Sequence, residues 1–261
     1  MKRATYLLLP VLLASCKITV PSEGTGAAAT PQRPTFSSNT ATTAEGTLEI
    51  EAGLLVDWKD RFDTPTTLKW GSTPTTEFFL TWSPYVNIDT MGVDGSSVGD
   101  TLIGVRQRVQ ETSDGQAATA FQLATKLPTS DEGEIGTTGE LDFFAAGIMD
   151  AKAAGLALTG FGQLGFLGEV DDEDIDLQWL FAGVAEVPIE DELSAFGEAA
   201  LFYTPERDEE SLYLTLGTYY RMQPSTVVDA AVQIGIGSDT PDFAVLVGFT
   251  QNLGRIGRAG S

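Results

Sequence analysis

The chain has 261 residues, a formal net charge of −22 at pH 7, one cysteine and no histidine. A single cysteine excludes an internal disulfide framework and a thiolate metal cluster, and the lack of histidine excludes a Ser-His-Asp triad and the usual zinc sites. The strong excess of acidic side chains excludes a surface that collects nucleic-acid phosphates.

The first fifteen residues have the layout of a secretory signal peptide. Lys2 and Arg3 give a positive start, residues 6–13 (YLLLPVLL) form a short apolar run, and small residues precede Cys16. The apolar run is too short to remain as a membrane-spanning helix. We therefore predict that residues 1–15 are removed during export.

Residues 13–16 (LASC) resemble the lipobox of bacterial lipoproteins, in which the cysteine receives a diacylglyceryl group before cleavage. The resemblance implies lipidation of Cys16, which is the one cysteine of the chain. The alternative is a plain signal peptide followed by an incidental cysteine. Lys17 occupies the next position, where an acidic residue would favour retention in the inner membrane, so we expect an outer-membrane protein whose lipidated N-terminus lies on the periplasmic side.

Residues 16–46 are rich in Thr, Ser, Ala, Gly and Pro and carry few large apolar side chains. Such a segment buries too little apolar surface to offset the entropy lost on ordering. We predict a disordered, flexible tether between the lipid and the folded part.

From Thr47 onward, apolar residues alternate with polar or small ones in runs of about ten. In the first run, Leu48 and Ile50 share one parity while Glu49 and Glu51 share the other, so the two sets face opposite sides of a strand. The pattern predicts twelve strands, near 47–57, 66–70, 76–87, 99–110, 118–127, 140–150, 155–167, 177–187, 193–203, 211–222, 227–237 and 242–253.

The connections between these strands alternate between long acidic or glycine-rich loops and shorter turns. An even number of antiparallel strands with long loops at one end is typical of an outer-membrane barrel. We predict an all-β fold, an antiparallel up-and-down transmembrane β-barrel over 47–253 with a C-terminal tail over 254–261. A soluble antiparallel sandwich on a lipid tether is the alternative. Aromatic residues near strand ends favour the membrane: Trp70, Trp82, Tyr85, Phe143, Phe166, Trp179, Tyr203, Tyr219, Tyr220, Phe243 and Phe249.

Residues 99–148 resemble the outer-membrane barrel family of the MetA pathway of phenol degradation, whose members are often described as transporters. The matching stretches are GDTLIGVRQRV from Gly99, ATKLPT over residues 124–129, and the acidic glycine-rich loop SDEGEIGTTG that follows. The resemblance implies a barrel and the passage of apolar or aromatic compounds.

The strand pattern places ten charged residues on the inward parity: Glu49, Glu51, Glu186, Glu198 and Asp229, with Lys69, Arg106, Arg108, Lys126 and Arg221 opposing them. One interpretation is a salt-bridged interior that fills a narrow barrel. The other is a polar path whose charges set selectivity for small solutes.

Residues 168–176 (GEVDDEDID) hold six carboxylates, but their spacing does not match an EF-hand, so we expect a solvated loop and no metal site. No pair of carboxylates is marked for acid–base chemistry, and we predict no enzymatic activity, no catalytic residue and no cofactor. The expected partners are outer-membrane lipid, the barrel-assembly machinery and a small-molecule solute, without nucleic acid.

The sequence thus favours a lipid-anchored outer-membrane barrel that acts as a transporter or channel for small molecules. The alternative is a non-transporting surface or structural lipoprotein whose acidic loops bind cations or partners.

Overall fold

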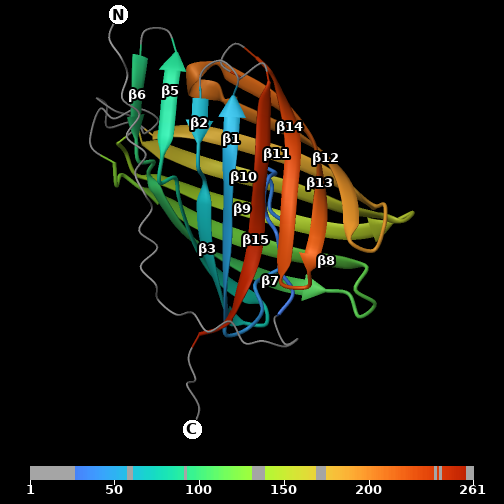
Figure 1. The fold of residues 1–261 in the computed structure, drawn as a ribbon. Coiled ribbons are helices and arrows are strands. Elements are labelled where there is room, and N and C mark those ends of the chain that lie inside the picture. Colours follow the sequence, from blue (N-terminus) through green and yellow to red (C-terminus); the bar gives the residue numbers. More distant parts are fainter. Residues whose placement is uncertain are drawn as a thin grey trace, which may run out of the picture.

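The computed structural model describes residues 27–57, 61–90, 93–130, 139–168, 175–237, 240 and 243–256. Within these residues the chain forms an antiparallel sheet that closes on itself, because β15 pairs with β1 from Thr47↔Arg255 to Asp57↔Ala244 (Figure 1). The closed barrel contains twelve strands: β1 (Thr47–Asp57), β3 (Thr66–Thr73), β4 (Thr76–Trp82), β7 (Thr101–Glu111), β8 (Ala117–Leu127), β9 (Asp142–Ala153), β10 (Leu156–Gly168), β11 (Ile175–Pro188), β12 (Leu193–Thr204), β13 (Glu209–Gln223), β14 (Thr226–Ile236) and β15 (Ala244–Arg255). The predicted twelve-strand barrel is confirmed.

Three short strands extend one side of the barrel: β2 (Arg61–Asp63), β5 (Val86–Thr90) and β6 (Val93–Ser97). β2 pairs with the end of β1, β5 pairs with β2, and β6 pairs with β5. Pro65 separates β2 from β3 and Pro84 separates β4 from β5, because proline cannot donate to a strand ladder. Parts of the loops predicted over 58–65 and 88–98 are therefore strands.

The two ends of the barrel differ in their connections. At one end, which we call the short-turn end, the turns are residues 74–75, 112–116, 154–155, 189–192 and 224–225. β1 begins and β15 ends at this same end. At the opposite, long-loop end, β1 ends at Asp57 and β10 ends at Gly168. Both ends of the barrel domain therefore lie on the side of the short turns, as the predicted even number of antiparallel strands requires.

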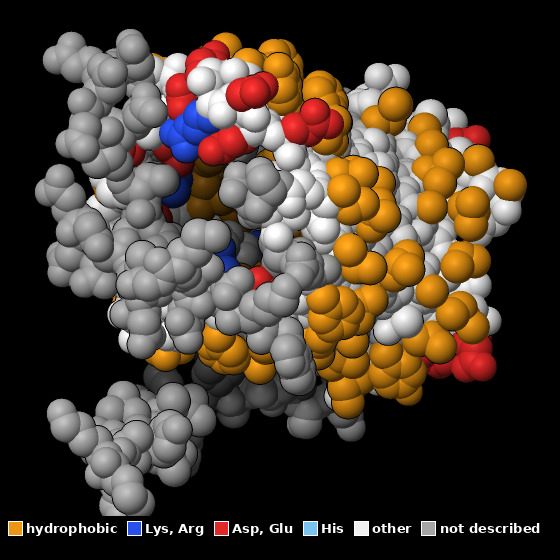
Figure 2. Space-filling view, turned by 90° about the horizontal axis from the view of Figure 1, so that it is seen from above, with side chains coloured by type: hydrophobic (Ala, Val, Ile, Leu, Met, Phe, Trp, Pro, Cys, Tyr) orange, Lys and Arg blue, Asp and Glu red, His pale blue; other side chains and the backbone are white. Residues whose placement is uncertain are grey.

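The predicted alternation along the strands is confirmed. Phe121 and Leu123 are exposed on the outside of β8, whereas Gln122 and Ala124 between them are buried in the lumen. In the view from the long-loop end, hydrophobic side chains are spread over the outside of the wall, and the lysine and arginine side chains in view gather around the mouth (Figure 2). An apolar outer face and a polar interior are what a membrane barrel requires.

Most of the aromatic residues predicted for the membrane interfaces are exposed on the outer wall: Trp70, Tyr85, Phe143, Phe166, Trp179, Tyr203, Tyr220, Phe243 and Phe249. Tyr219 is an exception, since its ring stacks on Phe196 at a centroid distance of 4.7 Å, within a cluster that includes buried Ala231 and Leu246. The sequence assignment of Tyr219 to the outer girdle is therefore wrong, because its neighbour Tyr220 holds the outward position.

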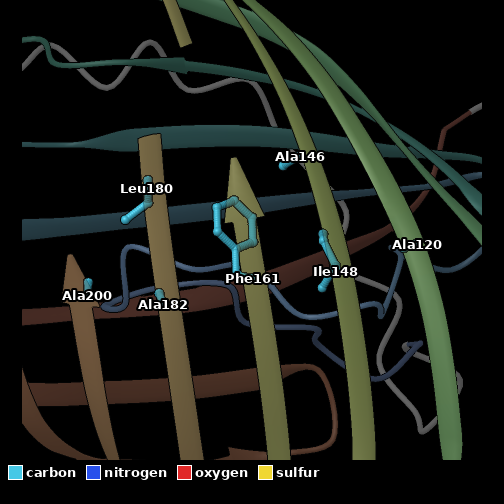
Figure 3. Packing of buried hydrophobic residues seen from close by; sticks show 7 residues of the cluster. All are labelled: Ala120, Ala146, Ile148, Phe161, Leu180, Ala182 and Ala200. Atoms are coloured by element: carbon cyan, nitrogen blue, oxygen red, sulfur yellow. The ribbon is translucent and has the colours of Figure 1, made fainter. Parts of the chain in front are cut away.

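One wall of the lumen is apolar. Seven buried residues from the neighbouring strands β8–β12 form this cluster: Ala120, Ala146, Ile148, Phe161, Leu180, Ala182 and Ala200 (Figure 3). Phe202 and Tyr213 pack against the cluster. The lumen therefore combines charged side chains with an apolar surface.

The prediction of a flexible tether is wrong for residues 27–46, which lie inside the barrel (Figure 1, blue). Thr43 has no exposed surface, and Ala29, Ser37 and Thr40 are also buried. The composition of the segment offers little apolar surface, and the segment is held instead by hydrogen bonds to wall carboxylates. Residues 16–26, including Cys16, lie outside the described residues.

Helical structure among the described residues is limited to a single 3-10 turn, Pro205–Arg207, after β12. In the part of the chain that the structure describes, no helix has the length and hydrophobicity to cross a membrane.

Candidate functional site: the barrel lumen

Residues 27–46, here called the lumen segment, rise into the barrel from the short-turn end and return to it. The Ala29 N–H donates to the carbonyl of Pro224 in the turn between β13 and β14, over 2.8 Å. Phe36 lies higher in the barrel, where its ring packs on Phe202 and Tyr213 at centroid distances of 5.1 and 4.8 Å. At the end of the segment, the Gly46 N–H donates to the Gly71 carbonyl over 2.7 Å.

Five carboxylates of the barrel wall accept hydrogen bonds from backbone N–H groups of the lumen segment. The donor, acceptor and shortest distance are Thr30 to Glu49 (3.1 Å), Gln32 to Glu51 (2.8 Å), Ser37 to Glu198 (2.9 Å), Thr40 to Asp150 (2.8 Å) and Thr43 to Glu77 (2.7 Å). The hydroxyl groups of Thr30, Ser37, Thr40 and Thr43 donate to the same carboxylates over 2.6–2.9 Å. Hydrogen bonds to an ionised acceptor are about twice as strong as neutral ones, so these contacts fix the segment.

Two wall cations complete this network. Lys69 Nζ lies 2.6 Å from Glu49 Oε1 and 2.7 Å from Glu51 Oε1, and it donates to the Thr30 carbonyl. Arg106 Nη1 lies 3.0 Å from Glu77 Oε1, and its Nη2 donates to the Gln122 side chain over 2.7 Å. Lys69 lies directly opposite Glu49 in the strand register, and Arg106 lies directly opposite Glu77. Cross-strand neighbours therefore neutralise one another on the wall.

Arg33 of the lumen segment reaches the seam between the first and last strands. Its Nη1 donates to the carbonyls of Ala52 on β1 and Val247 on β15, each over 3.2 Å. The same nitrogen lies 3.4 Å from Asp229 Oδ1 on β14. The lumen segment thus supplies the cation that pairs with Asp229. No lysine or arginine of the described wall forms an ion pair with this carboxylate.

The long-loop half of the lumen holds separate ion pairs. Lys126 Nζ lies 2.6 Å from Asp142 Oδ2 and 3.7 Å from Asp100 Oδ2. Arg207 Nε lies 2.5 Å from Asp176 Oδ2. These pairs join wall residues to each other or to the 3-10 turn, without the lumen segment.

The ten predicted lumen charges divide into three groups. Glu49, Glu51, Lys69, Arg106, Glu198 and Asp229 are buried around the lumen segment. Lys126 lies in the long-loop half, and Glu186, Arg108 and Arg221 lie at the short-turn end. The lipidation residue, Cys16, lies outside the described residues.

Of the five predicted bases, Lys69 pairs with two of the predicted acids, Glu49 and Glu51. Within the described residues, Arg106, Arg108, Lys126 and Arg221 form no ion pair with any of the five predicted acids. Arg106 and Lys126 bind other acids, Arg108 Nη2 donates to the Pro74 carbonyl, and Arg221 Nη1 donates to the Pro224 carbonyl. Asp229 instead pairs with Arg33, and Glu198 accepts hydrogen bonds from Ser37; both partners belong to the lumen segment, which the strand pattern did not place in the lumen.

Sequence reasoning missed Glu77, Asp150 and Asp142, and all residues of the lumen segment. Glu77 shares the polar parity of its strand, so the alternation could have identified it. Asp142 could have been found as the partner of Lys126 once the register of β8 and β9 was known. Nothing in the sequence marks Arg33, since its partner residues come from β1, β14 and β15.

Two cavities remain beside these contacts. One of about 360 Å³ lies at the short-turn end between the lumen segment and β11–β14, and Glu186, Tyr219 and Arg221 line it. The other, of about 290 Å³, lies in the long-loop half, lined by Trp82, Gln122, Lys126, Phe144 and Gln163 among others. Space for small molecules therefore exists both above and beside the lumen segment.

Within the described ranges, no group of three or more His, Cys, Asp or Glu residues is placed to hold a metal ion. Most of the acidic loop over 168–176 lies outside those ranges, since residues 169–174 are not described.

The chain is similar in structure to known porins. It matches the NanC porin with a TM-score of 0.57 and 9% sequence identity, over 78% of this chain and 98% of that one. It matches the KdgM porin, in a complex with disordered oligogalacturonate, with a TM-score of 0.56 and 8% identity over the same shares. No protein-family model and no curated protein matches the sequence. The fold is that of a porin-like β-barrel.

Proposed function

We propose that the protein is an outer-membrane channel that passes small solutes through its lumen, and that the lumen segment occupies part of the path. The observation that carries this proposal is the closed barrel with an apolar exterior and a charged interior. In outer-membrane barrels of this type, the polar interior is the route that solutes take.

The lumen segment should limit conductance, because it crosses the short-turn half of the barrel. Phe36→Ala removes the ring that packs on Phe202 and Tyr213 and should loosen the top of the segment. We expect this variant to conduct more than the wild type in planar bilayers. Phe121→Ala, which changes a lipid-facing ring, is the matched control. Equal and negligible conductance of all three proteins would contradict the channel.

A non-transporting barrel is the second candidate, and the filled short-turn half of the lumen favours it. Such a structural lipoprotein would use its acidic loops to bind cations or partners. It would give no solute-dependent swelling of liposomes in either the wild type or Phe36→Ala, so the same samples distinguish the two functions.

Apolar or aromatic compounds are the solutes implied by the resemblance to the MetA-pathway family. The apolar wall around Phe161 and Leu180 supports this class, because a purely polar pore would offer such molecules no favourable surface. Liposome swelling with phenol and with a sugar of similar size tests the preference. Faster entry of the sugar would contradict it.

Lipidation at Cys16 is the proposed anchor. The position of Ala29 beside the Pro224 turn supports an anchor on the periplasmic side, where short turns of outer-membrane barrels lie. Cys16→Ser should abolish acylation and N-terminal processing, as measured by mass spectrometry. A wild-type protein without lipid at Cys16 would contradict the anchor.

A further inference from the structure

The guanidinium group of Arg33 fills a notch in the barrel wall that two facing glycines create. Gly53 on β1 and Gly248 on β15 are direct partners in the closing ladder. A Cβ atom would lie 2.0 Å from Arg33 Nη1 at Gly53 and 1.3 Å from it at Gly248. Any side chain at either position would therefore collide with the guanidinium, and the notch exists because both residues are glycine.

The polar groups that line the notch are all hydrogen-bond acceptors. The Ala52 and Val247 carbonyls each accept a hydrogen bond from Arg33, and Asp229 stands opposite Gly248 in the ladder between β14 and β15. The Asp229 side chain is fully buried, and neither of its carboxylate oxygens accepts a hydrogen bond from the described part of the protein. A buried carboxylate without donors calls for a cation that carries N–H groups.

The occupant of the notch belongs to the lumen segment, which precedes β1 in the chain and is not a strand of the wall. Without the segment, six carboxylates would face this half of the lumen: Glu49, Glu51, Glu77, Asp150, Glu198 and Asp229. Lys69 and Arg106 would remain beside them as the wall cations of the same network. An open lumen of this composition attracts cationic solutes and repels anionic ones.

We propose that the notch formed by Gly53, Gly248 and Asp229 is a binding site for guanidinium or primary alkylammonium groups of solutes, and that Arg33 occupies it as an intramolecular substitute. A solute cation and Arg33 then compete for one site, so that binding of the solute favours release of the lumen segment. This inference rests on the proposed channel function, and it restricts the apolar or aromatic solutes proposed for that channel to those that carry a guanidinium or ammonium group.

Replacement of Arg33 by alanine in the full chain empties the notch and permits a direct test with methylguanidinium. We expect millimolar methylguanidinium to raise the thermal unfolding temperature of Arg33→Ala and to reduce its conductance. The effect on the wild type should be smaller at the same concentration, because methylguanidinium must first displace Arg33 there. Tetramethylammonium, which has the same charge but no N–H donor, should do neither. Arg61→Ala is a matched control, because it removes an arginine from Asp63 at a site where the arginine is partly exposed.

The double variant Arg33→Ala/Asp229→Asn should bind methylguanidinium at least about tenfold more weakly, since the charge-assisted contact is lost. Equal responses of the single and double variants would overturn the proposal. If Arg33→Ala does not fold alone, methylguanidinium added during refolding should restore the barrel, and failure of that rescue would also overturn it.

The two readouts separate this inference from the channel function. Conductance by Arg33→Ala without any response to methylguanidinium would reject the binding site and leave the channel standing. A methylguanidinium-dependent rise in unfolding temperature without conductance by any variant would support the site and reject the channel.

Discussion

In the long-loop half of the lumen, Lys126 meets Asp142 across neighbouring strands, and Arg207 meets Asp176. In the short-turn half, wall carboxylates such as Glu198 and Asp150 are satisfied by backbone N–H groups of the lumen segment. In the long-loop half, charged wall residues pair with one another or with the 3-10 turn. In the short-turn half, the wall carboxylates gain most of their hydrogen-bond donors only with residues 27–46 in place. The difference shows how a barrel can fill half of its lumen with a short segment of its own chain, without a separate plug domain.

The largest expected effect is the loss of folding stability when the deeply buried Lys69 is replaced, compared with replacement of Lys126 at the long-loop end. Lys69→Met leaves Glu49 and Glu51 without their shared partner and should lower the free energy of unfolding by about 3–5 kcal/mol. Lys126→Met, whose side chain is 18% exposed, should cost less, because water weakens the ion pair that is lost. Urea unfolding in detergent micelles measures both. Equal losses would mean that the two halves do not differ in burial.

A smaller effect is expected from charges added to opposite faces of the wall. Phe121→Arg places a charge in lipid near the middle of β8 and should destabilise the barrel by about 2–4 kcal/mol. Gln163→Arg, on β10 beside the long-loop cavity, should cost less because the lumen is polar there. Unfolding in lipid vesicles gives both values, and a larger loss for Gln163→Arg would reverse the assigned faces.

The smallest effect concerns one contact of the lumen segment. Thr43→Val removes the hydroxyl donor to Glu77 and keeps the backbone N–H donor, so the segment should lose about 1 kcal/mol of local stability. Protease cleavage within residues 27–46 should become faster while unfolding of the barrel stays unchanged. Unaltered cleavage would show that the hydroxyl does not hold the segment.

The sequence allowed the strands and their faces to be predicted, because alternation is a local pattern that burial in a membrane barrel imposes. Glu49 and Lys69 could be assigned to the lumen for this reason. Which acid meets which base could not be assigned in the same way, since Glu77 and Arg106, for example, meet only through the register of β4 and β7. The lumen segment could not be predicted, because it is held largely by its backbone N–H groups. Every residue except proline carries such a group, so the amino-acid composition does not indicate where these groups will bind.

Hydrogen exchange of the lumen segment in the full chain tests most directly whether the wall carboxylates hold it inside the barrel. The amide groups of Gln32, Ser37, Thr40 and Thr43 each donate to a carboxylate. We predict that they exchange at least about a hundredfold more slowly than in an unstructured peptide, which corresponds to about 2.8 kcal/mol of opening free energy. Exchange of all four amides at the unstructured rate would contradict the account.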